Sequence, residues 1–155
     1  MTQQSTDLVR RSVTVSAPIE RAFAVFTGDL ASWWPREYTW SKQGMEAAYV
    51  DSERGRWIER DSQGNEILWG ELLTWDPPNR IVLSWLISPQ RTIETDPARA
   101  SEIEIRFVSE GSSTSRVELE HRKFSRHGEG WESMRAGMDS DQGWSWILER
   151  YAAAV

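Results

Sequence analysis

Between residues 45 and 123 the sequence consists of short stretches in which apolar and polar residues alternate, separated by turn-forming residues. Strict alternation predicts β-strands with one buried face. The clearest stretches are residues 67–75, 81–87, 101–108 and 115–121. Because short connections join consecutive strands, antiparallel pairing in one sheet is favoured. A chain with this pattern is expected to fold around a continuous antiparallel sheet.

Helical patterns bracket these strands. After a first predicted strand over residues 9–15, Pro18 opens a segment whose apolar residues recur with helical spacing as far as Phe26. A second short helical turn is predicted before Pro35. A terminal helix is predicted from the spacing of Trp144, Ile147, Leu148 and Tyr151. The predicted fold class is therefore α+β: a curved antiparallel sheet of about six to seven strands around a long C-terminal helix, with two short helices after the first strand.

The composition is that of one globular domain. A chain of 155 residues with 39% hydrophobic residues suits a single core. Residues 1–155 are accordingly interpreted as one domain, with residues 1–7 expected to be disordered. The chain also contains ten tryptophans, and a surplus of these large rings can either fill a core or line an apolar pocket.

Several classes of function are disfavoured. The net charge of −6 and the lack of a basic run argue against a nucleic-acid partner. No apolar run approaches the roughly 20 residues of a membrane span. The chain has no cysteine and two histidines, and no metal, phosphate-loop or dinucleotide motif occurs in it. We therefore expect a cytoplasmic protein with no cofactor, no metal and no membrane partner, and the sequence assigns no catalytic residue.

Five segments carry a family resemblance: residues 13–23, 55–57 with Glu59, 69–85, 117–121 and 143–144. Together with the element order, they resemble the START-like or SRPBCC superfamily, the helix-grip fold, and within it the bacterial branch named for the activator of heat-shock protein 90 ATPase. The resemblance implies an apolar cavity between the sheet and the C-terminal helix. Related branches bind lipids, hormones or polyketides, and some cyclise or hydrolyse them.

Alternation assigns the candidate residues to faces of the sheet. Trp69, Glu71 and Leu73 share one phase, which is predicted to face inward, and Trp144 is predicted to meet them from the last helix. Trp33, Trp34 and Trp40 are placed near the short helices, where the cavity would open. The predicted ligand-binding residues are Trp34, Trp40, Trp57, Glu59, Trp69, Glu71, Leu73, Trp85, His121 and Trp144. Whether the inner tryptophans line an open cavity or fill a core is left open.

Three of these residues are polar side chains on a predicted apolar face: Glu59, Glu71 and His121. A buried carboxylate needs a partner, and an arginine such as Arg36 or Arg56 is one candidate. The alternative is that the three groups converge on a bound molecule as hydrogen-bonding or acid–base groups.

The leading interpretation is a domain that binds a small apolar, aromatic or lipid-like molecule in this cavity. One alternative is a cyclase- or hydrolase-type enzyme that acts in the same cavity through Glu59, Glu71 or His121. Another is a chaperone-associated interaction module that uses an exposed apolar patch, for which the segment around Trp33 and Trp34 is the candidate.

Overall fold

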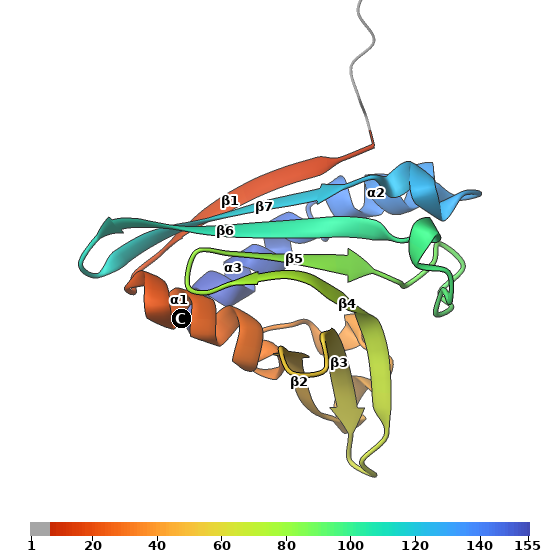
Figure 1. Ribbon diagram of the computed structural model, residues 1–155, viewed down its shortest axis with the longest axis horizontal. Coiled ribbons are helices and arrows are strands. Elements are labelled where there is room, and N and C mark those ends of the chain that lie inside the picture. The colour runs from red at the N-terminus through yellow and green to blue at the C-terminus, as the bar shows by residue number, and fades with distance from the viewer. Residues whose placement is uncertain (1–6) are drawn as a thin grey trace, which may run out of the picture.

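A curved antiparallel sheet organises the chain, as the computed structural model in Figure 1 shows. The structure describes residues 7–155, and within them seven strands form one sheet. The strands are β1 (Val9–Val15), β2 (Met45–Asp51), β3 (Arg56–Asp61), β4 (Glu66–Asp76), β5 (Arg80–Trp85), β6 (Ser101–Gly111) and β7 (Thr114–Arg122). Their spatial order, β1-β7-β6-β5-β4-β3-β2, places the first strand beside the last.

Helices connect the strands at two points and close the chain. The α-helices are α1 (Ile19–Gly28), α2 (Trp131–Asp139) and α3 (Trp144–Ala154). Short 3-10 turns are η1 (Leu30–Ser32), η2 (Arg36–Tyr38), η3 (Lys42–Gly44), η4 (Pro97–Arg99) and η5 (Phe124–His127). In Figure 1, α3 lies behind the central strands. The predicted α+β helix-grip fold is confirmed.

The core lies between the inner face of the sheet and the helices α1 and α3. Tyr151 is fully buried, and its hydroxyl donates to the carbonyl of Ala22 at 2.6 Å, which ties α3 to α1. The rings of Phe26 and Trp33 pack against the Tyr151 ring, with centroids 5.2 and 5.1 Å away. This end of the interior is therefore filled by aromatic side chains.

The predicted alternation holds in β7 and fails in β4. In β7 every second residue is buried, as predicted for Val117, Leu119 and His121. In β4, Leu72 pairs with Leu83 and Thr74 with Val82, so Leu73 is an extra residue without a partner in β5. Such a bulge reverses the side-chain phase that follows it.

The inward-facing position predicted for Leu73 is wrong, because the side-chain phase is already reversed at Leu72. Leu73 is 49% exposed, whereas Leu72 packs against the core. The reversal arises at an earlier bulge in β4, because Trp57 pairs with Gly70 and Ile58 with Leu68, which leaves Trp69 as the extra residue. Figure 1 shows β4 bending sharply between the central strands and the β2–β3 pair, as two bulges in one strand would produce.

Two further predictions concern disorder of the N-terminal residues and the lack of a membrane-spanning segment. The predicted disorder of residues 1–7 falls mainly on residues 1–6, which lie outside the described residues; Asp7 accepts hydrogen bonds from Phe124 N and Ser125 Oγ. Within residues 7–155, we find no helix with the length and apolar character needed to cross a membrane.

Candidate functional site

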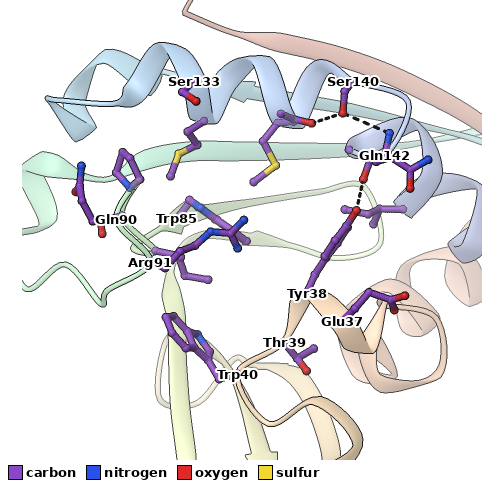
Figure 2. Close-up of a pocket in the computed structure, with 18 of the residues that line it drawn as sticks. Glu37, Tyr38, Thr39, Trp40, Trp85, Gln90, Arg91, Ser133, Ser140 and Gln142 are labelled. Carbon is purple, nitrogen blue, oxygen red and sulfur yellow. Dashed lines mark hydrogen bonds between the residues drawn. The ribbon is translucent and has the colours of Figure 1, made fainter.

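A pocket of about 680 Å³ opens at the end of the molecule where α2 approaches the loop after β5. It has three walls: one face of α2, the loop residues 87–91, and the segment 37–42 that contains η2. Figure 2 shows these walls facing one another, with α2 above and Trp40 at the far side. The C-terminal helix contributes Ile147. The cavity predicted between the sheet and this helix is thus displaced toward α2.

Tryptophan rings form the inner end of the pocket. Trp34 and Trp85 line it, with ring centroids 6.4 Å apart. Behind them, Trp69 and Trp57 are 1% exposed and contact the same cluster, the Trp34 and Trp69 centroids being 5.0 Å apart. The sequence left open whether the inner tryptophans line a cavity or fill the core. In the structure, some of them fill the core and others form the boundary of a pocket.

Glu59 fixes the wall formed by residues 37–42. Its side chain is fully buried and accepts hydrogen bonds from Trp40 N at 2.9 Å, Ser41 N at 2.7 Å and Trp69 Nε1 at 2.8 Å. Three donors converge on its two oxygens, which is the environment a buried carboxylate needs. The predicted arginine partner is wrong for Glu59, since Arg36 instead donates to the carbonyl of Met45 at 2.8 Å.

The loop after β5 is a tight turn that carries a cation into the pocket. Ser88 N donates to Thr92 O at 2.8 Å, and the hydroxyls of the same two residues are also 2.8 Å apart. At the tip of the turn, Arg91 has a φ of 63°, a left-handed conformation that is unusual for this residue. In Figure 2 the Arg91 side chain points from the loop into the pocket. It has no hydrogen-bond or ion-pair partner among residues 7–155.

The α2 wall is mainly apolar and carries two methionines beside Ser133. Met134 and Met138 line the pocket from one face of the helix, and Figure 2 shows sulfur atoms directed into it. Tyr38 closes the opposite side, where its hydroxyl donates to the carbonyl of Gln142 at 2.8 Å. Methionine side chains adapt to the shape of what they contact and interact well with aromatic rings.

His121 belongs to a buried hydrogen-bond chain that lies outside the pocket lining. Trp144 Nε1 donates to His121 Nδ1 at 3.1 Å, so the histidine proton is on Nε2, 2.7 Å from Ser101 Oγ. The Ser101 hydroxyl can then donate to His127 Nε2 at 2.8 Å. Both imidazoles are held in their neutral forms. Among residues 7–155, no group of three or more acidic or histidine side chains is arranged to hold a metal ion.

Acidification should destabilise the protein through this chain. Burial lowers the pKa of His121 well below 6.5, and burial, opposed in part by Glu94 and assisted by Arg99, lowers the pKa of His127 to about 4. Below pH 6.5 the unfolded chain binds more protons than the folded one, so the stabilisation is complete above that pH and is lost as the pH falls. From pH 6.5 to 5 we expect each histidine to cost about 1.5 kcal/mol of unfolding free energy.

Urea unfolding at half-unit pH intervals between 8 and 5 tests this expectation. His127→Gln removes one titrating group while leaving an acceptor near Ser101 Oγ, so its pH slope should be about half that of the wild type. An unfolding free energy that stays constant from pH 7 to 5 would rule out neutral, buried imidazoles.

The structure separates the ten predicted site residues into two groups. Those that line the pocket are Trp34, Trp40 and Trp85. Those that lie elsewhere are Trp57, Glu59, Trp69, Glu71, Leu73, His121 and Trp144. The three polar candidates are therefore not brought together in the pocket. Trp33, placed at the entrance by the sequence, is 1% exposed and donates to Val25 O from within the core.

The contributions of α2 and of the loop after β5 to the pocket were not predicted from the sequence. Arg91, Met134, Met138 and Tyr38 line the pocket but were not among the predicted residues. Two signals were present: the run from Ser88 to Ala100 was the longest stretch without a clear period, and the methionines share one helical face. Neither signal indicates which element the loop faces.

Comparison with protein families and curated sequences gives one match. The family described as "Activator of Hsp90 ATPase homolog 1-like protein" matches residues 16–155. Among curated protein sequences, no relative matches the chain.

Several solved structures are similar to the chain over nearly its whole length. The anthrahydroquino-gamma-pyrone synthase Txn09 is 39% identical, covers 96% of both chains and has a TM-score of 0.68. The self-sacrificing resistance protein CalC from Micromonospora echinospora is 32% identical, covers 95% of this chain and 92% of its own, and has a TM-score of 0.67. Protein NE0264 from Nitrosomonas europaea is 14% identical, covers 98% of this chain and 96% of its own, and shares the fold with a TM-score of 0.62.

Proposed function

Since the chain belongs to the activator of Hsp90 ATPase homolog 1-like family, we propose that it binds a small aromatic molecule in the pocket between α2, loop 87–91 and segment 37–42. Family membership agrees with the resemblance predicted from the sequence. The observation that carries the proposal is the pocket itself, whose lining combines aromatic rings with methionine side chains.

The size and chemistry of the lining support an aromatic ligand. A volume of about 680 Å³ lies within the range typical of small-molecule sites, roughly 300–1,000 Å³. Trp34, Tyr38, Trp40 and Trp85 supply ring faces and edges, and Met134 supplies a polarizable sulfur opposite them. Flat ligands gain most from such surroundings, because both stacking and sulfur–ring contacts need an aromatic partner.

Trp40→Ala tests the site against a matched control. Trp40 is 37% exposed and lines the pocket, whereas Trp75 is 39% exposed on β4 and lies outside it. We expect Trp40→Ala to lower the affinity for aromatic ligands about 10-fold, since a ring contact contributes roughly 1–2 kcal/mol to the binding free energy. Trp75→Ala should change affinity less than 2-fold.

The measurement is quenching of tryptophan fluorescence, confirmed by calorimetry, with a panel of fused-ring aromatics, fatty acids and sterols. Saturable binding of aromatics that depends on Trp40 supports the proposal. Absence of saturable binding by every aromatic compound, with the protein folded, would overturn it.

A second candidate function is catalysis on the bound molecule, and it is favoured by one observation. The relative with 39% identity is a synthase. The relative with 32% identity is a self-sacrificing resistance protein, so related chains of this fold include both an enzyme and a protective protein. Turnover of a bound aromatic precursor, followed by chromatography, distinguishes an enzyme from a protein that only binds.

The chaperone-associated alternative has less support. The segment suggested for docking contains Trp33 and Trp34, which are 1% and 2% exposed and therefore offer no apolar surface to a partner. We retain small-molecule binding as the primary proposal.

A further inference from the structure

Two buried indole N–H groups, both in tryptophans that line the pocket, have no hydrogen-bond acceptor within residues 7–155. They are Nε1 of Trp34 and Nε1 of Trp85, in residues that are 2% and 6% exposed. Buried polar groups are almost always hydrogen-bonded, so each exception requires an explanation. The third unpaired buried atom among the described residues is Oγ of Ser41, the residue between the lining residues Trp40 and Lys42 in the sequence. All three atoms therefore belong to residues that line the pocket or adjoin its lining in the sequence.

The other fully buried tryptophans provide the comparison. Each of them donates from Nε1 to a protein acceptor: Trp33 to Val25 O (3.2 Å), Trp57 to Ser84 O (2.9 Å), Trp69 to Glu59 Oε1 (2.8 Å) and Trp144 to His121 Nδ1 (3.1 Å). None of these four lines the pocket. Among the buried tryptophans of residues 7–155, the indole N–H groups without an acceptor are therefore those of the two residues that line the pocket.

We propose that the ligand carries a carbonyl or phenolic oxygen on a planar ring system, and that this oxygen accepts hydrogen bonds from the indole N–H groups of Trp34 and Trp85. The inference rests on the proposed function, because it specifies the chemistry of a ligand in the same pocket. It narrows the ligand from any aromatic molecule to an oxygenated one.

Neighbouring rings do not replace such an acceptor. Trp34 lies edge-on to Trp57, with centroids 6.2 Å apart and planes at 90°, and to Trp144, at 5.7 Å and 80°. Ring faces are weak hydrogen-bond acceptors compared with an oxygen atom. A ligand oxygen that reaches the indole N–H groups would therefore gain a stronger bond than the rings supply.

Arg91 adds a cationic hydrogen-bond donor to the pocket lining. Its guanidinium points into the pocket and has no partner among the described residues. An acidic oxygen, such as a phenolate, or a carboxylate or sulfonate substituent would pair with it near the mouth. The pocket thus offers neutral donors at its inner end and a charged donor at its rim.

A pair of matched probes tests the proposal: 9,10-anthraquinone-2-sulfonate and anthracene-2-sulfonate. They share a three-ring skeleton and an anionic substituent, and they differ in the two carbonyl oxygens. By calorimetry we expect the quinone to bind about 5-fold to 10-fold more tightly, the gain of one or two neutral hydrogen bonds.

Phenylalanine variants test whether the difference in affinity between the two probes comes from the indole N–H groups. Trp85→Phe and Trp34→Phe keep an aromatic ring and remove the N–H, so the preference for the quinone should fall below about 2-fold. Trp57→Phe is the control, because its N–H already donates to Ser84 O outside the pocket, and it should retain the preference.

Nuclear magnetic resonance of the wild-type protein provides a readout that does not depend on variants folding. In a ¹H–¹⁵N spectrum, the indole N–H signals of Trp34 and Trp85 are assigned through intraresidue contacts. Their proton shifts should move downfield with 9,10-anthraquinone-2-sulfonate and not with anthracene-2-sulfonate.

Equal affinities for the two probes, or shifts confined to other indoles, would overturn this inference and leave the proposed function intact. Failure of both probes and of the wider aromatic panel to bind would overturn the proposed function itself.

Discussion

Gly70→Ala is expected to lower the free energy of unfolding by about 4 kcal/mol or more, which is a large part of the roughly 5–15 kcal/mol of an ordinary domain. A Cβ atom at this position would lie 1.8 Å from Ser84 O and 2.4 Å from Trp57 Nε1. The Trp57 indole passes over Gly70 to donate to Ser84 O at 2.9 Å, so a methyl group would occupy the path of this hydrogen bond. The backbone of β5 and a buried ring would both have to move.

Gly28→Ala is the matched control. An added Cβ at Gly28 has no neighbour within 4 Å, so we expect a change of less than about 1 kcal/mol. Chemical denaturation measures both variants. If the free energy of unfolding of Gly70→Ala lies within 1 kcal/mol of the wild-type value, then the close packing of β4, β5 and the Trp57 ring is not as described.

Local patterns predicted most of the fold, because each strand or helix is encoded within a few consecutive residues. The period of two in β7 and the helical spacing from Trp144 to Tyr151 both correspond to observed elements. The failure in β4 has a specific cause, since bulges at Trp69 and Leu73 depend on pairing with two different neighbours. Alternation alone carries no information about an extra residue in one strand.

The pocket was less predictable than the sheet. Trp34, Trp40 and Trp85 were among the predicted residues, because large rings on the inner face or near the short helices can be recognised one at a time. Arg91 and Met134 were missed, because their roles require that the loop after β5 and α2 meet across a gap. That meeting depends on tertiary packing between segments some forty residues apart in the sequence.

The buried carboxylate illustrates the same limit. The phase of β3 placed Glu59 on the inner face, which is confirmed, but the two partners considered for it were an arginine and a bound molecule. The observed partners are two backbone N–H groups and an indole. Backbone donors have no residue type, so no sequence pattern identifies them.

Glu59→Ala is expected to cost about 3–5 kcal/mol of unfolding free energy. The substitution leaves three donors, Trp40 N, Ser41 N and Trp69 Nε1, without their acceptor, and an unsatisfied buried donor typically costs 1–3 kcal/mol. Glu59→Gln should lose about half as much, because its carbonyl keeps one acceptor while its amide group opposes a donor. Glu46→Ala, at an exposed position of the adjacent strand β2, should stay within about 0.5 kcal/mol.

The same substitutions separate support of the pocket from direct contact with a ligand. Glu59 does not line the pocket, but it holds the backbone at Trp40, which does. In the folded fraction of Glu59→Gln, aromatic affinity should therefore fall severalfold, and Trp40→Ala should add little further loss because both changes remove the same wall. Fully additive losses in this double-mutant cycle would mean that Glu59 and Trp40 act independently, and the carboxylate would then serve the core alone.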